Sequence, residues 1–337
     1  MGKIRSERAR FGQRLKRLRE LKGGMTQNEL AAKSGVSVDL ICNYEQGKSF
    51  AKDEALCALA SALKVSPAVF EACKLDFVAD LDARDGVCSA AHFLLQVSDA
   101  YGVRPYVDGD VAGICADEGY IEYAFCSWAD AVEADSSDGC SAQDSCCDEK
   151  DSSSRSLRKS SSAHVKAEVS REEWFILNFD EPFNADECVM IEPPSERIRE
   201  LRAQCGLSQQ ALAEETGISV FSLRSYEQGR RSLNDAHRRI LAKAFDIAPE
   251  ALLGFGIDNP AMTVHFLFEL AYFLRLEPRK MPNGNVAVSG VSGENQERLA
   301  LFESFVRAWH EALRVYSNSH DKDAYRRWAL RYGLEEN

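Results

Sequence analysis

The sequence lacks an apolar run of the roughly 18 residues that a membrane span requires. It also contains no glycine-rich phosphate loop, no zinc-protease motif and no nucleophile elbow. The first residues are basic, but no apolar core follows them as it would in a secretory signal. We therefore expect a cytoplasmic protein that is not membrane-bound and is not an enzyme.

Paired cysteine motifs are absent too. The eleven cysteines form no CxxC pair, and their number is odd. Most lie in apolar stretches such as ALCALASAL, so we expect reduced thiols that pack as small apolar side chains. One alternative stays open, a metal or redox site at Cys140, Cys146 and Cys147, although a Ser/Asp-rich segment surrounds them. We predict no metal and no cofactor.

The chain has no overall excess of basic residues, since its formal net charge is −12. The charge is unevenly distributed, however. Residues 1–70 hold 13 Lys and Arg against 7 Asp and Glu, whereas residues 71–194 hold 9 against 27. Because salt screens charges beyond roughly 10 Å, a local basic face matters more for phosphate binding than the total does. The first 70 residues are predicted to be a basic module on an acidic body.

An internal duplication organises the chain. The segment that starts at Met25 aligns without a gap with the segment that starts at Leu207, and 15 of 45 positions are identical. The shared run Tyr-Glu-Gln-Gly occurs at 44–47 and again at 226–229. A match of this length is improbable by chance, so we infer that one ancestral unit was duplicated.

The similarity continues beyond these units. AAHFLLQVSDAYGVRP and TVHFLFELAYFLRLEP each predict a helix that contains a histidine, His92 or His265, which we expect to be buried. Two short strands follow in each copy, with turns at 108–109 and 283–284, and then another helix. Trp128 and Trp309, at matching places in these last helices, are expected in the core.

These patterns predict a mainly α fold with two helical heads, each followed by a small helix–β-hairpin–helix module. The segment between the copies, rich in Ser and charge, is predicted to be an unstructured acidic linker. The expected order is a first head, a first module, the linker, a connecting segment, a second head and a second module: residues 8–71, 72–132, 133–165, 166–194, 195–254 and 255–337.

Each head carries the signals of a helix, a short turn and a second helix. Thr26 and Glu29 form a capping-box pattern, and Gly35 suits a left-handed helix end. Ser37 is placed to cap the next helix, whose Ile41 and Tyr44 should face the core. Ser208 caps the matching helix in the second copy, where Ala211 replaces the glutamate.

These residues resemble the Cro/CI-type, or xenobiotic-response-element, family of bacterial helix-turn-helix regulators. The resemblance covers roughly residues 8–70 and 195–253, and it implies two five-helix heads. It also implies sequence-specific binding to double-stranded DNA and repressor-like control of transcription. In this family the second helix of the motif reads base edges in the major groove.

The resemblance implies a set of DNA-contacting positions in each head. Gln27 and Gln209 would bind phosphate, and Lys48 and Arg230 would do so after the reading helix. The two reading surfaces differ, so the heads should recognise different bases. The full candidate set comprises Gln27, Ser37, Val38, Asp39, Cys42, Asn43, Lys48, Gln209, Ser219, Val220, Phe221, Arg224, Ser225 and Arg230.

Val38 and Asp39 depart from the Gln, Arg or Lys that the family often carries at these positions. An aspartate repels phosphate, although it can accept a hydrogen bond from cytosine. An alternative therefore stays open, in which degenerate heads serve a protein-interaction or antitoxin-like adaptor. Homodimerisation and a small-molecule or protein effector of the accessory modules also remain open.

Overall fold

The computed structural model describes residues 2–22, 24–74, 81, 84–138, 191–290, 296–319 and 322–334. The candidate metal site at Cys140, Cys146 and Cys147, most of the predicted linker and the connecting segment up to residue 190 lie outside these ranges. None of the described helices is long and apolar enough to cross a membrane. Within the same ranges, no group of three or more His, Cys, Asp or Glu is arranged to hold a metal ion.

The first head is a bundle of five helices with its own apolar core. Phe11, Leu15 and Leu18 on the first helix are fully buried, as their spacing predicts. The helices are α1 (Gly2–Leu21), α2 (Gln27–Ser34), α3 (Val38–Glu45), α4 (Asp53–Leu63) and α5 (Ala68–Glu71). A short 3₁₀ helix, η1 (Ala72–Lys74), leads out of the head.

The second head repeats this arrangement and closes on a 3₁₀ turn where the first head has α5. Its core includes Ile198, Leu212 and Leu223. The elements are α9 (Pro194–Gln204), α10 (Gln209–Thr216), α11 (Val220–Glu227), α12 (Asp235–Phe245) and η4 (Pro249–Leu252). The mainly α fold with two such heads is therefore confirmed.

The two accessory modules form one body, which we call the central body. The repeat predicts two separate modules, but their hairpins join into a single antiparallel sheet with the order β1-β2-β4-β3 over a shared core. The elements are α6 (Arg84–Tyr101), β1 (Arg104–Asp108), β2 (Val111–Cys115), α7 (Gly119–Asp138), α13 (Pro260–Leu274), β3 (Leu276–Lys280), β4 (Val286–Gly290), α14 (Gln296–Ser319) and α15 (Lys322–Arg331).

The register of this sheet shows an approximate two-fold relation between the copies. Ile114 lies opposite Pro105 in the first hairpin, and Val288 lies opposite Pro278 in the second. Ile114 and Val288 also pair with each other across the central strands. This row has a proline on each outer strand and a β-branched residue on each central strand. The two copies thus associate within one chain as the subunits of a symmetric dimer would.

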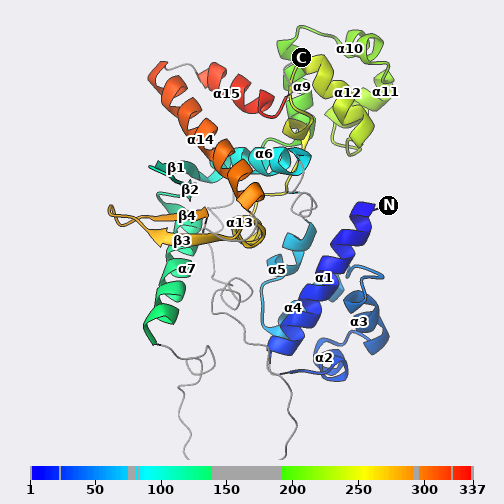
Figure 1. The fold of residues 1–337 in the computed structure, drawn as a ribbon. Helices are drawn as coiled ribbons and strands as arrows, with labels where there is room; N and C mark the ends of the chain where they lie inside the picture. The colour runs from blue at the N-terminus through cyan, green and yellow to red at the C-terminus, as the bar shows by residue number, and fades with distance from the viewer. Residues whose placement is uncertain are drawn as a thin grey trace, which may run out of the picture.

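The copies are also interlocked (Figure 1). Helix α7 of the first copy packs on β3 and β4 of the second, and α14 of the second packs on β1 and β2 of the first. Trp128 on α7 and Trp309 on α14 are both fully buried, as predicted. The predicted start of the linker at residue 133 is wrong, because α7 continues to Asp138. In this extension the Glu133 carboxylate accepts a hydrogen bond from Lys280 Nζ on β3, with Nζ and Oε2 2.8 Å apart.

Each head rests on the first accessory helix of the other copy. The first head contacts α13 through α5 and η1, and the second head contacts α6 through η4. Matched arginines support both heads: the Nη1 of Arg14 donates to the Val69 carbonyl at 3.0 Å, and that of Arg197 donates to the Ala251 carbonyl at 2.7 Å. Arg14 also forms an ion pair with Glu269 on α13.

Both accessory histidines are buried, as expected from the sequence. His92 lies 3.0 Å from the Tyr332 carbonyl through Nε2, which must carry the proton because a carbonyl only accepts. The pKa of His92 is lowered to about 4, chiefly by burial and in smaller part by nearby Arg197, while the bond to Tyr332 opposes the shift. The folded state therefore holds a neutral imidazole.

This burial predicts that acid destabilises the protein. Above pH 6.5 the histidine is neutral in both states, whereas between pH 6.5 and 4 only the unfolded state binds the proton. The free energy of unfolding should fall by about 2 kcal/mol from this residue between pH 7 and 5. Urea unfolding at both pH values measures it. His92→Gln should flatten the dependence, and the same change at exposed His310 should not; equal slopes for both would contradict the assignment.

Candidate nucleic-acid interface

Local capping sets where α3 and α11, the predicted reading helices of the two heads, begin. The Thr26 hydroxyl accepts from the Glu29 amide while the Glu29 carboxylate accepts from the Thr26 amide, so the predicted capping box is present. Gly35 ends α2 with a φ of 72°, which favours glycine. Ser37 caps α3 through the Leu40 amide, and Ser219 caps α11 through the Ser222 amide. These two hydroxyls therefore fix where the reading helices begin.

Glycine brings the first helix of the first head close to the reading helix. A Cβ placed on Gly12 of α1 would collide with the backbone carbonyl of Tyr44 on α3. Ile41 and Tyr44 point inward and are buried, and the same is true of Leu223 and Tyr226 in the second head. The opposite face of each reading helix is consequently left toward solvent.

Half of the eight predicted reading residues on α3 and α11 are exposed. Val38, Asp39, Phe221 and Arg224 are exposed, and the remaining reading positions are half-buried: Cys42, Asn43, Val220 and Ser225. Phe221 is 79% exposed, an unusual environment for a phenylalanine in a folded domain. Lys48 and Arg230 are exposed just beyond the helix ends, as predicted.

The two predicted phosphate-binding glutamines are held by internal contacts. The Nε2 of Gln27 donates to the Glu45 carboxylate at 2.8 Å, and the Nε2 of Gln209 donates to the Glu227 carboxylate at 2.8 Å. Each amide nitrogen has two hydrogens, so one remains to face a ligand. The glutamines are therefore oriented before any ligand arrives.

A buried ion pair stands behind each glutamine. Arg19 donates to Glu45 at 2.7 and 3.0 Å, and Arg202 donates to Glu227 at 2.7 and 3.1 Å. Burial alone would raise the pKa of Glu227, but the hydrogen bonds from Arg202 and Gln209 lower it below its usual range. The glutamate thus stays ionised and keeps both donors in place.

These two ion pairs are not among the sequence-based predictions, although the sequence carries a signal for them. The glutamates belong to the repeated Tyr-Glu-Gln-Gly run, and each arginine lies in the matching first helix. Two further residues were missed: Leu40, which is 44% exposed on α3, and Arg231, which is exposed beside Arg230. The second head therefore presents two adjacent cations after its reading helix where the first presents Lys48 alone.

Removing the carboxylate of one pair should loosen one head. In Glu227→Ala, Arg202 loses its carboxylate partner and keeps only the Leu207 carbonyl. The free energy of unfolding of that head should therefore fall by about 2–3 kcal/mol. Differential scanning calorimetry should show a transition that moves to lower temperature. Glu196→Ala on the exposed face of α9 is the matched control and should change little. An unshifted transition in Glu227→Ala would contradict a structural role for the pair.

Comparison with protein families agrees with this geometry. Residues 10–72 match the family model described as a helix-turn-helix domain, and residues 198–252 match a second model described as helix-turn-helix. The chain carries two tandem helix-turn-helix domains. Comparison with curated proteins and with solved structures finds no match. The resemblance drawn from the sequence is thus confirmed for the two helix-turn-helix domains, which are DNA-binding domains.

Proposed function

We propose that the chain is a cytoplasmic, repressor-like transcription regulator whose two helix-turn-helix domains bind one DNA duplex, with α3 and α11 in the major groove. It acts by binding and carries out no catalysis. The contacts are those predicted from the sequence: Arg224 and Asn43 reach base edges, and Lys48 and Arg230 reach phosphates.

One observation carries this proposal. Both heads are fixed to the same central body, and α3 and α11 both lie on the outer margin of the molecule away from the sheet (Figure 1). The helices are therefore presented together and not on independent tethers. A chain that holds two reading helices in this way gains the avidity of a dimer without needing a second copy.

The differing reading faces predict an asymmetric site. Asp39 in the first head corresponds to Phe221 in the second, and Cys42 corresponds to Arg224. A phenyl ring can contact a thymine methyl group, whereas an arginine can bind both acceptors of guanine. The two halves of the target should therefore not be copies of one palindrome.

Selection of duplexes from a random pool tests the proposal. Full-length protein should enrich a bipartite, asymmetric motif, and the affinity should fall by several orders of magnitude between about 50 and 200 mM salt as counterions are released. Arg224→Ala should relax one half of the motif and Asn43→Ala the other. If nothing is enriched at either salt concentration, sequence-specific DNA reading is excluded.

A protein-interaction role is the second candidate. Phe221 and Leu40 place exposed apolar groups on the two faces that should contact DNA. Exposed aromatic side chains are also typical anchors of protein interfaces. DNA binding that lacks both salt dependence and sequence preference, together with loss of a protein partner in Phe221→Ala, would favour this role.

A further inference from the structure

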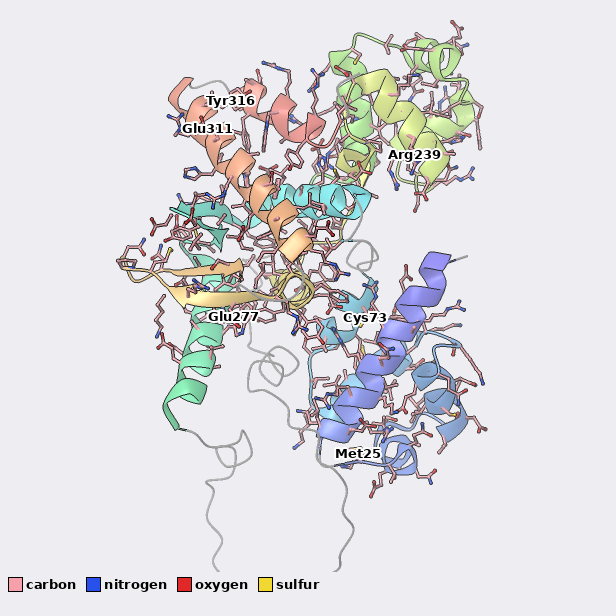
Figure 2. All side chains as sticks on the ribbon, in the orientation of Figure 1. Met25, Cys73, Arg239, Glu277, Glu311 and Tyr316 are labelled. Carbon is pink, nitrogen blue, oxygen red and sulfur yellow. The ribbon has the colours of Figure 1, made fainter. Side chains whose placement is uncertain are left out.

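A cavity of about 960 Å³ lies where the second head meets the central body. It is surrounded by α6, α9, α14 and α15 (Figure 1), and Tyr316 lies on the part of α14 next to α15 (Figure 2). Its size is that of a site for a small organic molecule. Apolar side chains form much of its wall, among them Leu95, Ile191 and Leu313.

The cationic groups in this wall are already paired. Arg197 binds the Ala251 carbonyl at 2.7 Å and the Glu192 carboxylate at 3.4 Å. Arg326 binds Glu200 at 2.6 Å and Glu192 at 3.5 Å. Carboxylates therefore offset the charge of both guanidinium groups.

Two carboxylate groups in the wall, those of Asp99 and Glu192, have oxygens that accept no hydrogen bond from the described residues. Within the described part of the chain, Asp99 makes no hydrogen bond, and the buried Oε1 of Glu192 has none either. Asp99 remains accessible to solvent, yet partial desolvation by the surrounding protein raises the pKa of its carboxyl, while Arg197 and Arg326 lower it. A carboxylate in such surroundings is stabilised by a donor that also carries positive charge.

Two aromatic rings line the same cavity. The Tyr325 hydroxyl accepts a hydrogen bond from Trp309 Nε1 at 3.0 Å, which fixes the ring. Burial raises the pKa of Tyr325 to about 12, and the charge of nearby Asp99 contributes, so the phenol stays neutral. Neutral tyrosine faces attract organic cations, and Tyr316 adds a second ring.

We propose that this cavity binds a small organic ammonium compound with an apolar or aromatic body. The ammonium group donates to Asp99 and to Glu192 Oε1, while the apolar body packs against Leu95, Leu313 and the two tyrosines. The unpaired acceptors and the occupied arginines together select a cation over an anion.

The site also joins the second head to the body, so its occupant should affect that head. Helix α15 contacts the head through the Leu330 carbonyl, which accepts from the Ala248 amide at 2.9 Å, and through Arg326 and Glu200. A ligand here contacts both α9 and α6. Any resulting change in DNA affinity rests on the proposed function, whereas binding of the ligand does not.

Calorimetric titration of the full chain without DNA tests the site independently of DNA reading. Phenethylamine should bind with a Kd on the order of 1 mM or tighter, while phenylacetate and 2-phenylethanol, which share its ring, should bind at least about tenfold more weakly. Asp99→Asn should weaken phenethylamine binding about tenfold or more. Asp110→Asn, in the exposed turn between β1 and β2, is the matched control and should leave it unchanged.

Three results would overturn the proposal: no binding of phenethylamine at about 10 mM, equal or tighter binding of phenylacetate, or unchanged binding in Asp99→Asn. Thermal unfolding of each variant without ligand shows that it is folded, so loss of binding is not mistaken for loss of structure. If phenethylamine binds but DNA selection fails, the ligand site stands and the proposed function falls.

Discussion

Replacing Glu269 by alanine should lower the free energy of unfolding by about 4 kcal/mol, because it leaves the guanidinium of Arg14 without its carboxylate at a buried junction. Glu269 is only 2% exposed, and it joins the central body to the first head across the chain. Urea denaturation followed by circular dichroism measures the loss. The first head should also become more susceptible to proteolysis.

Two variants make this prediction specific. Gln96 occupies the matching position on α6 and donates a neutral hydrogen bond to the Leu253 carbonyl at 3.0 Å, so Gln96→Ala should cost only about 1 kcal/mol. The double variant Arg14→Met/Glu269→Leu removes both charges and should regain most of the stability. If it is as unstable as Glu269→Ala, the unpaired charge is not the cause.

Reversing the charge of Arg224 should lower the affinity for the selected duplex on the order of 1000-fold. Arg224→Glu places a carboxylate in the groove of an anionic duplex, so the second head is lost from the complex. The chain then also loses the gain that comes from binding with two heads at once. Fluorescence anisotropy on the selected duplex at constant salt measures the change.

Arg314→Glu is the matched control for this charge reversal. Arg314 is exposed on α14, in the central body, where it pairs with Glu311. The substitution alters the net charge by the same amount, so a long-range electrostatic effect would weaken DNA binding equally in both variants. Comparable losses would show that Arg224 does not read DNA directly.

The heads could be predicted from the sequence because their signals are local. Thr26 and Glu29 are three residues apart, and Ser37 lies at the start of the helix it caps, so each cap is set by close neighbours. The fully buried Phe11, Leu15 and Leu18 follow the helical period without reference to the rest of the chain. The second copy carries the same local signals again.

The central body could not be predicted in the same way. Its central strands pair Ile114 with Val288, and no local pattern specifies which of several hairpins will meet across so long a separation. The ion pair of Arg14 with Glu269 is equally unpredictable from the sequence, because the two residues are far apart along the chain and no local pattern marks either of them. Among the described residues of the first copy, no helix corresponds to α15.

For the candidate interface, the sequence predicted the positions of the reading residues but not the ion pairs that hold the two glutamines. The reading residues follow from the helix-turn-helix pattern, and the structure places Phe221 and Arg224 on the exposed face of α11. The ion pairs behind Gln27 and Gln209 depend on packing between the first and third helices, which spacing alone does not specify.

Hydroxyl-radical footprinting of the full chain on the selected duplex tests most directly whether two fixed heads bind one DNA molecule. The expected result is two protected segments on one face of the duplex. At saturating protein, Arg224→Glu should remove one segment and Lys48→Glu should weaken the other. A single protected segment, or a footprint that neither substitution changes, would contradict the account.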